Sequence, residues 1–240
     1  MELKEKQTSL VGKAYESIKE QILELDLMPG QIISDFTLHK EMGMSRTPIK
    51  QALMQLKSDG LIVERDGRGY EIRRITEEDV IDLFDAREGI ERTALKIAME
   101  RGISQETLSE LMCLNTSLSN ADSQGDYRKV FDIDSEIHVK LIEAAKNVRL
   151  IEYYEMIILQ LRRMRLLTYF EKTLPEQAAT AHLQLLRAII ENDFNTALEI
   201  LSSHILRTKE HYVSIIRTRI ATDDDFRVLK YLMNNNLSVE

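Results

Sequence analysis

The sequence predicts a mainly α-helical chain, and three observations support that fold class. Only three prolines and nine glycines interrupt 240 residues, which favours long helices over many short strands. Hydrophobic residues make up 43% of the chain, as in an ordinary globular protein with a sizeable core. Apolar side chains recur at spacings of three and four residues along most of the length, which is typical of helices with one buried face.

Composition also excludes several classes of protein. A single cysteine, Cys113, rules out a disulfide framework and a zinc site built on paired cysteines. The charged N-terminus lacks the apolar core of a signal peptide, and no run of eighteen apolar residues could span a membrane. We therefore expect a cytoplasmic protein that has no membrane partner.

Residues 1–75 predict a winged helix-turn-helix, because three short helices precede a hairpin. The helices are expected at about 14–27, at 34–42 and from Ser45 to Ser58. In the third helix Pro48 falls in the first turn, where a missing N–H costs nothing. Two β-prone runs around Asp66-Gly67 then predict the hairpin. The exposed start of the third helix is where a recognition helix faces base edges.

The charge pattern permits a nucleic-acid partner although the net charge is −8. Residues 46–74 hold seven Lys or Arg against four Asp or Glu, a local excess of three positive charges (7 − 4 = 3). A basic face of this kind can bind DNA on an otherwise acidic protein. A lone basic residue is nevertheless most often just solvated, so the whole pattern matters more than any member.

Residues 76–220 predict an all-helical antiparallel bundle, and residues 221–240 a peripheral tail. Helices are expected from Thr76 to Gly102, from Ser104, and over 127–145, 150–170, 176–191 and 196–220. Short connections between them favour antiparallel neighbours.

Four polar residues of the bundle form a possible metal site. Asp134 and His138 lie at i and i+4 on one helix, so both side chains project from one face. His182 and His204 lie on or beside the apolar faces of two later helices. One carboxylate and three imidazoles suit a divalent transition metal such as Zn, Ni, Mn or Fe. Spacing alone leaves the alternative open that each histidine is a hydrogen-bonded core residue.

The first domain resembles the GntR-type bacterial transcription regulators. The resemblance rests on Gly43-Met44-Ser45-Arg46-Thr47-Pro48-Ile49-Lys50-Gln51-Ala52-Leu53 followed by Asp59-Gly60-Leu61-Ile62. It implies that Arg46 reads a guanine and that the other DNA contacts come from Ser45, Thr47, Lys50 and the wing residue Arg68.

Two departures from that family pattern bear on the operator sequence. Lys50 stands where the family usually has arginine, and a lysine cannot form the two-pronged contact to guanine. Asp35-Phe36-Thr37 stands where the family often has Glu-Arg-Glu, so Phe36 replaces a DNA-contacting arginine. We therefore expect an operator different from the commonest one in the family.

The second domain resembles the FCD effector domain of the FadR subfamily of these regulators. The matching stretches are Asp134 to His138 with Asn147, and His182 through Asn192-Asp193 to His204. The resemblance implies that Asp134, His138, His182 and His204 bind a divalent metal beneath a cavity for a small organic acid.

The same resemblance implies that Arg87 lines that cavity. A guanidinium beside a metal with open positions suits a carboxylate ligand. The alternative for Arg87 is an ion pair with Glu91, one helical turn further on. Three arginines lie within four residues and cannot all face inward, namely Arg162, Arg163 and Arg165. We predict that Arg163 is a second contact to the effector.

Together these features predict a homodimeric DNA-binding regulator, a repressor in the simplest case, and not an enzyme. Its operator is expected to be a pseudo-palindromic DNA duplex, and its affinity for it to be controlled by a small organic carboxylate. Two alternatives are a regulator that senses the metal itself and a DNA-tethered metalloenzyme. The enzyme would need a general base near the metal, and Glu136, two residues from His138, points away from it.

Overall fold

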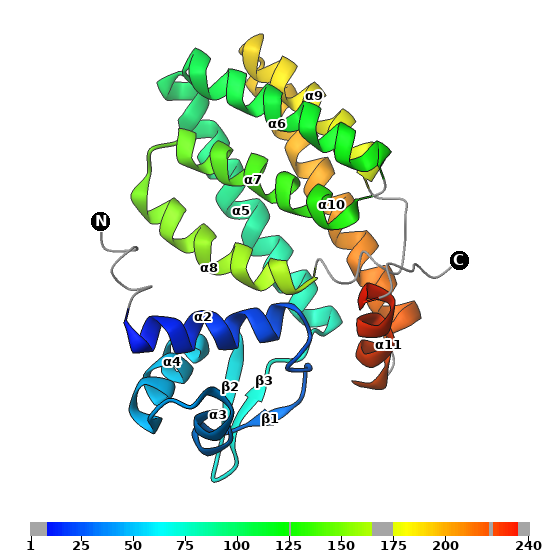
Figure 1. The fold of residues 1–240 in the computed structure, drawn as a ribbon. Helices are drawn as coiled ribbons and strands as arrows, with labels where there is room; N and C mark the ends of the chain where they lie inside the picture. The colour runs from blue at the N-terminus through cyan, green and yellow to red at the C-terminus, as the bar shows by residue number, and fades with distance from the viewer. Residues whose placement is uncertain (1–8, 125, 165–174, 221–222, 235–240) are drawn as a thin grey trace. The chain divides into compact units, whose positions relative to one another are not determined.

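The computed structural model describes residues 9–124, 126–164, 175–220 and 223–234, which fall into two compact units. The first comprises the chain up to Ile75 together with Ile220–Asn234, and the second begins at Thr76. The described chain is mainly helical with one small sheet, so the predicted fold class is confirmed (Figure 1). None of the described helices is long and apolar enough to cross a membrane.

Three helices and a three-stranded sheet make up the N-terminal part of the first unit. In chain order they are α2 Leu10–Leu23, β1 Ile32–Ile33, α3 Asp35–Met42, α4 Arg46–Ser58, β2 Ile62–Arg65 and β3 Gly69–Ile72. The sheet has the order β1-β3-β2, and both pairs are antiparallel. Helices α2 and α3 pack against α4, which buries Ile49, Ala52, Leu53 and Leu56. The expected apolar stripe of the third helix is thus its core face.

The first helix lies about four residues earlier than the periodicity predicts. Ser9 caps its start by accepting a hydrogen bond from the backbone N–H of Gly12 at 3.0 Å. Leu25 has a left-handed backbone, with φ of 56°, and this ends the helix before Leu25 and Leu27. Both leucines are buried nonetheless. The apolar pattern therefore continues past the point where helical geometry stops, which explains why the predicted helix ends too late.

The short strand β1 was not predicted, and a glycine makes its pairing possible. Gly69 in β3 has φ of +92°, and a Cβ atom there would lie 2.5 Å from the carbonyl oxygen of Ile33. Only glycine fits that close backbone approach.

The sequence predicts a peripheral tail over residues 221–240, but Asp223–Asn234 form a helix, α11, grouped with the first unit. Phe226 and Leu229 of this helix are buried. The ammonium group of Lys230 donates a hydrogen bond to the carbonyl oxygen of Leu25 at 3.0 Å and pairs with Asp26. The C-terminal helix therefore holds the corner that follows α2.

The second unit is an all-helical bundle. Its helices are α5 Glu77–Arg101, α6 Gln105–Ser123, α7 Tyr127–Ala144, α8 Val148–Met164, α9 Pro175–Ile190 and α10 Phe194–Arg219. Short connections place α6 against α7, α7 against α8 and α9 against α10, and α5 packs against α7, α8 and α10. The helix expected over 150–170 is described only to Met164.

Small residues let three of these helices approach closely. Ala94 and Ala98 of α5 pack in one buried cluster with Ile142, Ala145 and Tyr154. Because α5 presents methyl groups there, α7 and α8 can come near enough for polar side chains to meet in the interior. The site described below depends on that close packing.

Candidate metal centre and nucleic-acid interface

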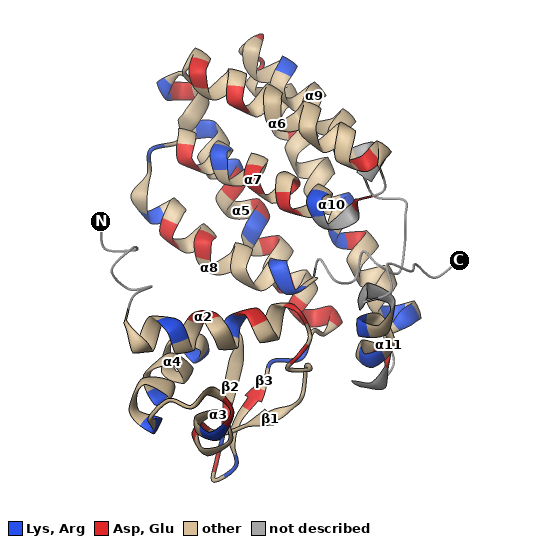
Figure 2. Cartoon of the chain, viewed as in Figure 1, with Lys and Arg blue, Asp and Glu red and all other residues tan. Residues whose placement is uncertain are grey.

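The start of α4 presents the residues expected to contact DNA. Ser45, Arg46, Thr47 and Lys50 are all exposed, with side-chain exposures of 53% for Arg46 and 61% for Lys50. Arg68 is exposed in the turn between β2 and β3. Lys and Arg colour parts of α4 and of the hairpin in Figure 2. The structure thus leaves these side chains accessible to a ligand.

A carboxylate from the neighbouring helix holds Arg46. Oδ2 of Asp35 accepts hydrogen bonds from Nε of Arg46 at 2.7 Å and lies 2.6 Å from its Nη2. The ammonium of Lys50 lies 3.8 Å from the same oxygen. Asp35 belongs to the Asp35-Phe36-Thr37 stretch that departs from the family pattern, but its pairing with Arg46, eleven residues away, was not predicted. This contact fixes the start of α3 beside the start of α4.

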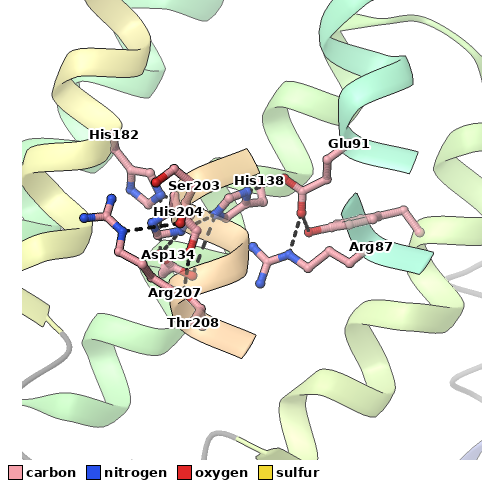
Figure 3. Close-up of polar contacts among 10 residues, drawn as sticks. Arg87, Glu91, Asp134, His138, His182, Ser203, His204, Arg207 and Thr208 are labelled. Atoms are coloured by element: carbon pink, nitrogen blue, oxygen red, sulfur yellow. Dashed lines mark hydrogen bonds and ion pairs between the residues drawn. The ribbon is translucent and has the colours of Figure 1, made fainter. Parts of the chain in front are cut away.

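Four side chains from three helices converge in the second unit. Asp134 and His138 come from α7, His182 from α9 and His204 from α10, and their ligand atoms lie within 4.8 Å of one another (Figure 3). Nε2 of His138 lies 3.2 Å from Nε2 of His204 and 3.3 Å from Nε2 of His182. The carboxylate of Asp134 lies 3.5 Å from Nε2 of His182 and 3.8 Å from Nε2 of His204. The three imidazoles are buried.

The donor set fits a metal ion better than a hydrogen-bonded core. Ligand atoms about 2.0–2.1 Å from a tetrahedral zinc ion are about 3.3 Å apart, close to the spacings seen here. Hydrogen bonding alone would direct several imidazole nitrogens and a carboxylate at one point, with too few protons to share among them. Nδ1 of His182 is also buried, and no acceptor meets it among the described residues.

Glu91 of α5 orients one of these imidazoles. Its Oε2 lies 2.5 Å from Nδ1 of His138, while its Oε1 accepts hydrogen bonds from Arg87 at 2.5 Å and from the Tyr154 hydroxyl at 2.9 Å. Burial alone would raise the pKa of Glu91, but its interactions with Arg87 and with the Nδ1 side of His138 outweigh burial and lower that pKa to about 2. The ionised carboxylate therefore accepts the Nδ1 proton, and the Nε2 lone pair of His138 faces the cluster.

The other two histidines are neutral at physiological pH. Burial lowers the pKa of His182 to about 4, although the carboxylate of Asp134 opposes this shift. Burial also lowers the pKa of His204 well below its usual value, and the neighbouring histidines add to the effect. Neutral imidazoles are the form that binds metals.

Arg87 forms the expected ion pair with Glu91, and one of its donors has no acceptor among the described residues. Its side chain is 5% exposed, and burial opposes its charge, but the carboxylate of Glu91 raises its pKa on balance. Its Nη2 is buried, and no described residue accepts a hydrogen bond from it. In Figure 3 the guanidinium extends from α5 toward the four-residue cluster. The two roles weighed for Arg87 are therefore compatible.

The structure distinguishes two of the three arginines near the end of α8. Arg163 is buried at 5% exposure, whereas Arg162 is exposed. Arg165 lies outside the described residues.

Sequence reasoning did not find that Glu91 contacts His138 or that Tyr154 contacts Glu91. The spacing of four residues between Arg87 and Glu91 predicts their ion pair, but no local signal links Glu91 to His138, 47 residues away. That contact depends on how α5 packs against α7.

A winged helix-turn-helix followed by a helical bundle is the architecture of a bacterial transcriptional regulator. Residues 10–72 match the bacterial regulatory proteins of the gntR family, and residues 82–207 match the FCD domain. The chain belongs to the GntR family of regulators that carry an FCD domain. The families and relatives are transcriptional regulators and not enzymes, as the sequence predicts.

Several transcriptional regulators are similar to most of this chain. The Nta operon transcriptional regulator of Aminobacter aminovorans is 23% identical over 191 residues, covering 79% of this chain and 88% of that protein. The transcriptional repressor GlaR of Escherichia coli is 23% identical over 207 residues, covering 83% of this chain and 93% of that protein. The structure of McbR/YncC from E. coli has a TM-score of 0.72 at 19% identity, covering 86% and 98%. That likeness concerns the fold.

Proposed function

We propose that this protein is a homodimeric transcriptional repressor of the FadR subfamily. In the cytoplasm, its affinity for a DNA operator would respond to a small organic carboxylate bound at a metal centre. One observation carries the proposal. Four side chains of metal-ligand type converge in the bundle interior, and beside them a buried arginine has a donor from which no described residue accepts a hydrogen bond.

Asp134, His138, His182 and His204 would hold the metal, and Glu91 would keep His138 in its binding tautomer. A divalent Zn, Ni, Mn or Fe ion with an open coordination position would offer a Lewis-acidic site for one carboxylate oxygen. Nη2 of Arg87 would donate a charge-assisted hydrogen bond to the same acid. Because Arg87 already has Glu91 as its counter-charge, it can meet an anion without giving up its own partner. Arg163 is the second candidate contact to the acid.

The winged helix would read DNA through Ser45, Arg46, Thr47 and Lys50 of the recognition helix, with Arg68 in the wing. A homodimer would place two such helices one helical turn apart on a pseudo-palindromic duplex. The effect of the acid on operator affinity is then a coupling free energy between the two sites, about 1–3 kcal/mol in typical cases, or roughly 5–150-fold.

The first test is a thermal-shift screen of small mono- and dicarboxylic acids on metal-loaded and chelator-stripped protein. A ligand that binds only the folded state raises the apparent melting temperature by mass action. We expect an acid that stabilises the loaded protein and has no effect on the stripped one. If the metal stabilises the fold and no acid adds to it, the protein senses the metal itself or uses it structurally.

A matched pair of arginine variants places the acid. Arg87→Lys keeps a cation next to Glu91 but loses the planar guanidinium group that can contact Glu91 and the acid at once. The affinity for the acid should therefore fall by about tenfold or more. Arg92→Lys makes the same change on the same helix, in an exposed pair with Glu88, and should leave the affinity unchanged. Equal effects of the two substitutions would remove Arg87 from the effector site.

The DNA half of the proposal has its own test. Arg46→Ala should abolish sequence-specific operator binding in a fluorescence-anisotropy titration at fixed salt. Lys13→Ala removes an exposed cation from α2 and serves as the control. Specific binding retained by Arg46→Ala would refute this assignment.

A further inference from the structure

Phe36 is an exposed aromatic side chain beside the recognition helix. Its residue is 50% exposed, in the first turn of α3. Leu38, two residues further on, is 1% exposed and forms the core face of that helix. Residues two apart on a helix point about 200° apart around its axis, so Phe36 points away from the core that Leu38 faces. A single exposed apolar residue is common on protein surfaces, so exposure alone assigns no role.

The position of Phe36 is more informative than its exposure. Asp35, the adjacent residue, holds the guanidinium of Arg46 through its carboxylate and lies 3.8 Å from the ammonium of Lys50. The first turn of α3 is thereby fixed next to the exposed start of α4. Phe36 follows Asp35 in that turn, so it stands on the segment of α3 that adjoins the residue expected to read a base.

A cation accompanies the ring. The ammonium of Lys40, one turn along α3, lies 4.4 Å from the centroid of the Phe36 ring. This cation–π contact holds the ring on the outer face of the helix and places a positive charge where phosphates would approach. Phe36 and Lys40 therefore form an apolar and basic pair on the exposed face of α3, the helix whose first turn adjoins the start of α4.

We propose that Phe36 is a specificity-determining residue that packs against the 5-methyl group of a thymine, next to the base that Arg46 reads. The thymine methyl is the one apolar group that base edges present in the major groove, and phenylalanine is among the side chains that contact it. This inference rests on the proposed DNA recognition by α4. It adds a position in each half-site at which the protein prefers thymine.

The test removes a single methyl group from the DNA. An operator is selected from a random duplex pool with the full-length wild-type protein, and each thymine is replaced in turn by uracil, which pairs identically but lacks the methyl. For the wild type we expect one position per half-site where uracil weakens binding about fourfold, the effect of burying one methyl group. Phe36→Ala should bind the thymine and uracil operators equally well, at the weaker level.

Three further variants separate contact from structure. Phe36→Leu keeps an apolar surface and should retain part of the preference for thymine. Leu10→Ala truncates another exposed apolar residue of the same unit, at 59% exposure, and should leave the preference intact. Lys40→Met should lower the salt dependence of binding by about one phosphate contact without changing the preference for thymine.

The outcomes distinguish this inference from the function on which it rests. Sequence-specific binding without any methyl-sensitive position would overturn it. So would a uracil penalty that persists in Phe36→Ala, or an equal loss of affinity on both operators. If the wild type selects no operator at all, the proposed DNA recognition fails, and the role of Phe36 fails with it.

Discussion

Replacing Glu91 with glutamine should weaken metal binding although Glu91 is not a predicted ligand. The carboxylate accepts the Nδ1 proton of His138 at 2.5 Å and so directs Nε2 into the cluster. Loss of such a partner behind a metal-bound histidine typically lowers metal affinity 10–100-fold, or about 1.4–2.7 kcal/mol. Glutamine has nearly the same shape, so the change tests charge and hydrogen bonding rather than volume.

The same substitution should also destabilise the fold. Arg87 is buried and would lose its counter-charge, and breaking one side of a buried ion pair typically costs about 3–5 kcal/mol. Metal affinity is measured by competition with a chromophoric chelator, and stability by chemical unfolding of the metal-free protein. If Glu91→Gln does not fold, the double variant with Arg87→Met removes both charges and restores a test of the metal affinity.

Glu88→Gln is the matched control for this prediction. Glu88 lies on the same helix and pairs with Arg92 at 3.2 Å, but both side chains are partly exposed. Such exposed ion pairs contribute little to stability. The free energy of unfolding should therefore change by less than about 0.5 kcal/mol, and the metal affinity by less than about twofold. A folded Glu91→Gln protein with the metal affinity of the wild type would refute the role assigned to Glu91.

Three more predictions concern stability. The metal-free protein should lose about 3 kcal/mol of unfolding free energy as pH falls from 6.5 to 4. Over this range His182 takes up a proton in the unfolded chain, whereas in the folded protein its pKa of about 4 keeps it neutral. Chemical unfolding measured across this pH range should therefore show a smaller loss for His182→Asn. Leu229→Ala should cost about 2–4 kcal/mol in urea unfolding because this side chain of α11 is fully buried, whereas Val228→Ala, at 52% exposure, should stay within about 0.5 kcal/mol; equal effects would mean that α11 is not docked. Gly69→Ala should cost several kcal/mol more than Gly67→Ala, because both have positive φ but only Gly69 meets a backbone oxygen, and thermal unfolding of the two variants compares them directly.

Several features could be predicted from local sequence alone. The stripe of Ile49, Ala52, Leu53 and Leu56, together with the turn residues of the hairpin, indicated the winged helix. Helical periodicity and the hairpin turn depend on near neighbours in the chain, so short stretches of sequence carry them. For the same reason, the spacing of four residues was enough to place Asp134 and His138 on one face of α7.

Local patterns failed where contacts join distant segments. The apolar run through Leu25 and Leu27 continued the helical pattern, but the left-handed backbone of Leu25 ended α2 earlier. Strand β1 depends on the close approach of Gly69 to Ile33, and the docking of α11 depends on Lys230 reaching Leu25. None of these contacts leaves a periodic signal.

The sequence by itself determined which chemical groups this protein carries and on which helices they stand. The family resemblance implied that His182 and His204 join Asp134 and His138, but only the tertiary structure decided how closely their ligand atoms approach and that Glu91 supports His138 from α5. It likewise joined Asp35 to Arg46 and thereby placed Phe36 beside the recognition helix. The physical reason is that helical spacing fixes direction around one axis, whereas the distance between side chains on different helices depends on how closely those helices pack.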